Sequence, residues 1–187
     1  MNKRSFLATC SLAALLCACT TTSGVGGDPA AKRRSIDADV DSALSKLYAQ
    51  VSGSKELAAK ARGVLVFPSV VSAGFVLGGS YGEGALRAGG HTEGYYSTVA
   101  GSVGLLAGAD SKAVYLLFMT QEALDKFRAS GGWTAGADAS VTMVTVGANA
   151  GVDTTTARQP VVGYVLSNAG LMANLSLDGT KITKLQL

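Results

Sequence analysis

The chain has 187 residues, of which 48% are hydrophobic and only 16% are charged, and its formal net charge is +3. This length suits a single domain, and the apolar content is enough to form a core of that size. The small net charge excludes the strongly basic surface that holds nucleic acid, so we expect no nucleic-acid partner.

The N-terminal segment has the composition of a secretion signal. Lys3 and Arg4 precede an apolar run of roughly 13 residues, which is too short to span a membrane and suits the core of a signal peptide. The run ends in the sequence LCAC at residues 16–19, which resembles the bacterial lipobox. We therefore predict a lipoprotein signal peptide over residues 1–18 and a diacylglyceryl group on Cys19, with an ordinary signal peptide as the alternative.

Cleavage before Cys19 would affect redox chemistry, charge and location. Cys19 would be the one cysteine left of the three, so no disulfide is expected. Loss of Lys3 and Arg4 would lower the excess of basic over acidic residues from three to one. Thr20 follows the cysteine in place of the aspartate associated with inner-membrane retention, which predicts an outer-membrane lipoprotein whose domain lies in the periplasm.

Residues 19–34 are predicted to form a flexible tether, because they begin with a polar, glycine-containing stretch. The domain is predicted over residues 35–187. It opens with a helix at residues 35–51, where apolar residues recur at helical spacing and Ser35 suits the N-cap position. Gly53 ends this helix, and a shorter helix is expected over residues 55–62.

Two interpretations of the first helix are open. It either packs its apolar face on the core, or lies on a membrane with that face down, guided by the basic residues 32–34. Asp37, Asp39 and Asp41 argue against the membrane interpretation, because anionic lipid would repel them.

After Gly63 the pattern changes to short apolar segments separated by glycine. The run AVYLLFM at residues 113–119 is the most apolar and predicts a central strand, and Thr120 caps a helix at residues 121–129. Many consecutive strands argue for one α+β domain with an antiparallel, strongly curved or barrel-like sheet of about eight strands and three helices. The other strands are expected at residues 64–68, 75–77, 82–87, 94–103, 132–153, 160–166, 169–177 and 181–187.

The glycine-rich stretch GFVLGGSYGEGALRAGG at residues 74–90 raises the question of a phosphate-binding loop. Such a loop needs a helix after the glycines, and none is predicted here. We instead predict a hairpin in which missing side chains let the strands bend or a neighbouring strand come close.

No catalytic constellation is evident, so a non-catalytic protein without metal or cofactor is expected. His91 is the only histidine, and no G-x-S-x-G motif is present. A carboxylate metal site from Glu83, Glu93 and Asp110 is conceivable, but solvated turn residues are the favoured interpretation. A hydrolase would require two of the residues Glu83, Glu93, Asp110 and Asp138 to converge in a deep pocket.

Several sequence blocks together resemble the SYLF domain from about Gly63 to the C-terminus. They are VLVFP at 64–68, GFVLGGSYGEG at 74–84, GGW at 131–133, DASV at 138–141, and GLMA with LSLDGTKI between 170 and 182. The resemblance implies a lipid-binding module. Eukaryotic members bind phosphoinositides with help from an amphipathic N-terminal helix and basic residues, and some members bind actin.

The sequence and the resemblance together predict a lipoprotein that binds a phospholipid membrane through anionic head groups. Phosphatidylglycerol or cardiolipin would take the place of phosphoinositides. The rival is an envelope structural or protein-interaction module anchored by its lipid, which an exposed apolar patch without a basic rim would favour. The candidate head-group contacts are basic side chains that can pair with phosphate: Lys32, Arg33, Arg34, Lys60, Arg62 and Arg87.

Overall fold

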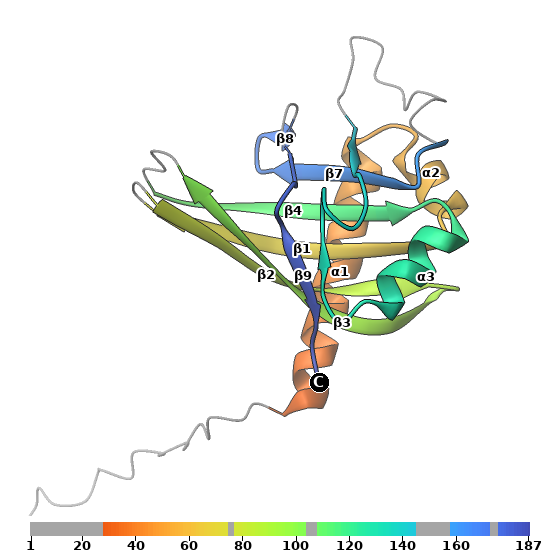
Figure 1. Ribbon diagram of the computed structural model, residues 1–187, viewed down its shortest axis with the longest axis horizontal. Helices are drawn as coiled ribbons and strands as arrows, with labels where there is room; N and C mark the ends of the chain where they lie inside the picture. The colour runs from red at the N-terminus through yellow and green to blue at the C-terminus, as the bar shows by residue number, and fades with distance from the viewer. Residues whose placement is uncertain (1–27, 75–76, 104–107, 145–157, 173–175) are drawn as a thin grey trace, which may run out of the picture.

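The computed structural model describes residues 28–74, 77–103, 108–144, 158–172 and 176–187 (Figure 1). The predicted signal peptide, Cys19 and most of the predicted tether lie outside the described residues. The helices are α1 (Pro29–Gln50), α2 (Ser54–Lys60) and α3 (Gln121–Ala129).

Helix α1 begins earlier than its apolar pattern predicts. The Asp28 carboxylate accepts hydrogen bonds from the backbone N–H groups of Ala30 and Ala31, and Pro29 occupies the first helical turn. The predicted cap at Ser35 is therefore wrong, and residues 29–34 of the predicted tether are helical. Apolar residues recur at helical spacing only from Ile36 onward, where α1 contacts the core. The polar first turns of the helix therefore lack this pattern.

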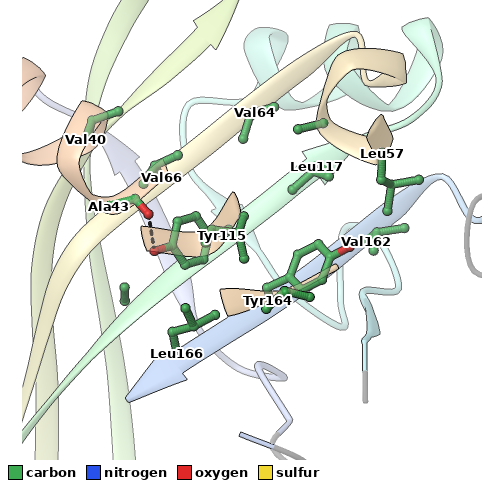
Figure 2. Packing of buried hydrophobic residues seen from close by; sticks show 14 of the residues in the cluster. Val40, Ala43, Leu57, Val64, Val66, Tyr115, Leu117, Val162, Tyr164 and Leu166 are labelled. Atoms are coloured by element: carbon green, nitrogen blue, oxygen red, sulfur yellow. Dashed lines mark hydrogen bonds between the residues drawn. The ribbon is translucent and has the colours of Figure 1, made fainter. Parts of the chain in front are cut away.

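The apolar face of α1 packs on the sheet, as the core-packing interpretation predicted. Ile36, Val40, Ala43 and Leu47 are buried there. Tyr115 reaches the helix from the sheet, and its hydroxyl donates a 2.8 Å hydrogen bond to the carbonyl oxygen of Ala43 (Figure 2). The membrane-lying interpretation is wrong for this face, because the core already covers it.

The strands form one curled sheet, which confirms the α+β class. The order is β5-β9-β3-β2-β1-β4-β7-β6, with β8 on β7. All pairs are antiparallel except the parallel pair β6–β7, so the predicted purely antiparallel sheet is wrong in this detail. The bounds are β1 (Gly63–Gly74), β2 (Leu77–Ala88), β3 (His91–Val103), β4 (Gly108–Phe118), β5 (Trp133–Thr134), β6 (Thr142–Met143), β7 (Val161–Ser167), β8 (Gly170–Leu171) and β9 (Lys181–Lys184).

The middle of the sheet is buried on both faces. Strand β4 lies between β1 and β7, which confirms the predicted central strand. Its side chains alternate between a core under α1 and α2, which includes Tyr115 and Leu117, and a core under α3, which includes Leu116 and Phe118. Because both faces are covered there, residues 113–118 of β4 form a continuously apolar run.

The glycine-rich stretch lies in β2 against an irregular part of β1. The register between β1 and β2 shifts between Val66 and Ser69. A Cβ atom on Gly82 would lie 2.8 Å from the Ser69 carbonyl oxygen, and one on Gly84 would overlap the Val66 carbonyl oxygen. The close-approach interpretation of the glycines is therefore confirmed at these two positions.

The segment at residues 132–153 was expected to form strands, and those that the structure describes in it are short. Within its described part, only β5 and β6 are extended, and a turn separates them. In that turn the Asp138 carboxylate accepts a 2.6 Å hydrogen bond from the N–H of Thr134, and Gly136 has a φ of 86°. The alternating small residues mimic a strand but offer little apolar surface to bury.

Candidate functional site

A polar cluster fastens α1 to the sheet. The Asp37 carboxylate accepts hydrogen bonds from the hydroxyls of Thr92 at 2.7 Å and Tyr95 at 2.8 Å, both on β3. Arg87 on β2 pairs with Asp41 at 2.7 Å and lies 3.4 Å from Asp37. The side chains that the sequence placed on an acidic helix face therefore hold the helix in position.

A second polar contact joins the first turns of α1 to β2. The carboxylate oxygen Oε1 of Glu83 accepts hydrogen bonds from Lys32 Nζ and from the Tyr81 hydroxyl, both at 2.7 Å. Burial acts to raise the pKa of the Glu83 carboxyl, but the hydrogen bonds from Lys32 and Tyr81 outweigh it and lower that pKa. The hydrogen bond to Glu83, with some burial, raises the pKa of Tyr81 to about 12.

Shallow grooves run along α1 on both sides of Asp39. One has a volume of about 300 Å³ and is lined by residues that include Lys32, Tyr81 and Glu83. The other has a volume of about 360 Å³ and reaches Lys46 and Tyr115. Both are open and mixed in charge, so they suit a surface contact better than an enclosed small ligand.

The structure does not gather the six predicted basic residues into one patch. Lys32, Arg33, Arg34 and Arg87 lie around the first half of α1, whereas Lys60 and Arg62 follow its far end. Lys32 and Arg87 are ion-paired, and Arg34 lies 3.7 Å from Asp28 with both side chains exposed. Among the described residues, the side chains of Arg33, Lys60 and Arg62 have no ion-pair partner.

The four carboxylates of the hydrolase alternative lie apart in separate contacts. Glu83 pairs with Lys32, Glu93 on β3 pairs with Arg128 on α3, and Asp138 stays within its own turn. Asp110 is exposed on β4. Within the described ranges, no three His, Cys, Asp or Glu residues are grouped as a metal site would require.

Sequence reasoning missed an apolar surface beside α1, which we call the exposed row: Val71, Tyr81 and Val99. These side chains are 46%, 50% and 51% exposed. They lie side by side on three neighbouring strands, because Tyr81 on β2 is paired with Val71 on β1 and with Val99 on β3. The available signal was the absence of charge from residue 70 to 82 and from 94 to 109.

Comparison with known families finds a match for part of the chain. The family model described as "Ysc84: Las17-binding protein actin regulator" matches residues 99–186, from within β3 to beyond β9. Residues 99–186 are therefore similar to the SYLF family. No curated protein matches the chain.

The match confirms the resemblance in its C-terminal half. The blocks GGW, DASV and GLMA fall inside the matched range, whereas VLVFP and GGSYGEG precede it in β1 and β2. The SYLF family is known for lipid and actin binding.

In the part of the chain that the structure describes, no helix is both long and apolar enough to cross a membrane.

Proposed function

We propose that this chain is a SYLF-family protein and a non-catalytic lipid-binding lipoprotein of the bacterial cell envelope. Cys19 would anchor it to the outer membrane, and the domain would bind anionic phospholipid head groups from the periplasm. The observation that carries the proposal is the family match over residues 99–186, because the family is known for lipid binding.

The charges of the described residues indicate which contacts to test first. Arg33, Lys60 and Arg62 have no ion-pair partner among those residues, so their charges are available to lipid phosphate. Lys32 and Arg87 are neutralised by carboxylates and would have to exchange partners. Phosphatidylglycerol and cardiolipin are the expected ligands, with phosphoinositides as the family's comparison lipid.

The test is vesicle co-sedimentation of the chain beginning at Thr20, which lacks the anchor. Phosphatidylethanolamine vesicles are compared with vesicles that also contain phosphatidylglycerol, cardiolipin or a phosphoinositide, at low and high salt. We expect binding to the anionic vesicles that weakens as salt rises, because salt screens exposed charges. Lys60→Glu and Arg62→Glu should reduce this binding. Lys184→Glu on β9 is the matched control, because Lys184 is also exposed and has no ion-pair partner among the described residues.

A second candidate is a protein-interaction module of the envelope that is only anchored by its lipid. The family description favours it, since it names a Las17-binding actin regulator, a protein that acts on proteins. Absence of binding to every vesicle would leave membrane attachment to Cys19 alone and make this candidate the leading one.

A further inference from the structure

The exposed row lies on the same face of the sheet as α1. Tyr81 lines the groove beside Lys32 and Ile36 of that helix. Val71 and Val99 are its direct cross-strand neighbours, and directly paired side chains point to the same face. The row therefore continues the α1 face of the sheet beyond the part that α1 covers.

The surroundings of the row are small and uncharged. Two residues further along each strand, Gly79 lies between Ala73 on β1 and Gly101 on β3, and all three residues are exposed. Charged side chains enter at the margins, where Lys181 on β9 pairs with Val99 in the ladder and Lys32 reaches Glu83. The patch thus has lysines at its rim, which distinguishes it from an apolar patch without a basic rim.

The predicted anchor starts close to this surface. Lys32 and Tyr81 bind the same oxygen of Glu83, so the first turns of α1 lie beside the row. Nine residues, 20–28, separate Cys19 from the start of α1 at Pro29. Even fully extended, such a segment spans at most roughly 30 Å. A lipid on Cys19 would therefore hold the row near the bilayer.

We propose that the exposed row and its strip of small residues form the surface that this domain lays on the lipid bilayer. The inference rests on the proposed lipid-binding function and names the surface that performs it. Tyr81 has the amphipathic ring that suits the membrane–water interface, and Val71 and Val99 add apolar area. No charge has to be desolvated within the patch. At the rim, the exposed Lys181 is placed to meet head groups, whereas Lys32 neutralises the Glu83 carboxylate beside Tyr81.

The experiment uses the full-length, lipidated protein in vesicles. An environment-sensitive fluorophore is attached to Val99→Cys, and the matched control carries it on Ala129→Cys, an exposed position on α3 across the sheet. Mass spectrometry first verifies the lipid on Cys19 and a single labelled thiol. We expect spin-labelled lipids to quench the fluorophore several-fold more at residue 99 than at residue 129, in zwitterionic vesicles and at high salt.

A second pair of variants tests whether the row itself makes the contact. With the fluorophore at residue 99, Val71→Asp should reduce the quenching, whereas Ala129→Asp should leave it unchanged. Equal quenching at residues 99 and 129 overturns the inference. A blue shift at residue 99 that lacks quenching and grows with protein concentration also overturns it, because a second copy of the chain would then cover the row.

The two proposals fail in different ways. If head-group binding fails, the chain beginning at Thr20 does not prefer anionic vesicles, while quenching at residue 99 of the anchored protein persists. If the row does not touch lipid, quenching at residue 99 is absent, while salt-sensitive sedimentation with anionic vesicles remains.

Discussion

Arg87 shows how a candidate ligand-binding residue can instead hold the fold together. Its side chain is 23% exposed and pairs with Asp41, and its guanidinium also donates to the Asp37 carbonyl oxygen. We expect Arg87→Gln to lower the free energy of unfolding by about 1–3 kcal/mol, because it removes charge-assisted hydrogen bonds between β2 and α1. Urea denaturation measures this change.

The matched control for Arg87 is Arg62, which is exposed and has no ion-pair partner among the described residues. Arg62→Gln should change the free energy of unfolding by no more than about 0.5 kcal/mol. Equal losses in the two variants would contradict the docking role of Arg87.

The sequence named the six basic residues but could not rank them. The partners that distinguish them are remote, since Lys32 meets Glu83 51 positions away and Arg87 meets Asp41 46 positions away. The exposed row was missed for the same reason. Val71, Tyr81 and Val99 look like ordinary strand residues until the register brings them side by side.

At the scale of elements, the β1–β2 contact depends on two glycines in β2. Gly84→Ala would place a Cβ atom on the Val66 carbonyl oxygen, where β1 changes register. Because backbone would have to move, we expect a loss of about 1–3 kcal/mol in the free energy of unfolding. Thermal or urea denaturation of the purified variant measures it.

Gly101 on β3 is the control for this substitution, since a Cβ atom there meets nothing within 4 Å. Gly101→Ala should be neutral, or stabilising by up to about 1 kcal/mol through the lower entropy of the unfolded chain. A Gly84→Ala variant as stable as Gly101→Ala would show that β1 yields easily and would remove the steric explanation of the glycines.

Elements were predictable where local chemistry alone decides them. Helix α3 has both a capping residue and an apolar face, and its bounds and its Thr120 cap agree with the prediction. The start of α1 also has a local signal, in the Asp28 cap and Pro29, but the apolar periodicity used for the prediction does not include it. In the described part of residues 132–153, the outcome depends on contacts with β7 and β9 that no short window contains.

In the whole molecule, the segment that matches the family model, residues 99–186, forms two parts of the sheet that are not neighbours. Strands β3 and β4 follow each other in the chain and both reach into residues 99–186. In the sheet, however, β2 and β1 lie between them (Figure 1). The matched segment therefore lacks the two strands that join its halves. It also lacks α1 and α2, which cover Tyr115 and Tyr164.

We therefore predict that a fragment of residues 99–186 does not fold on its own. Without β1 and β2 the ladders β1–β4 and β2–β3 are lost, and the core under α1 is open to water. The fragment should show no cooperative thermal transition and no near-ultraviolet circular dichroism from Trp133, which is buried in the intact chain.

The comparison is the chain that begins at Asp28, which keeps the cap of α1 and all strands. It should unfold in one cooperative transition with the near-ultraviolet spectrum of a packed core. A cooperative transition in the shorter fragment would mean that β3 and β4 can pair without β1 and β2. The segment before residue 99 would then be an addition to the family's domain. The strand order argues against this, because it places β1 and β2 at the centre of the sheet.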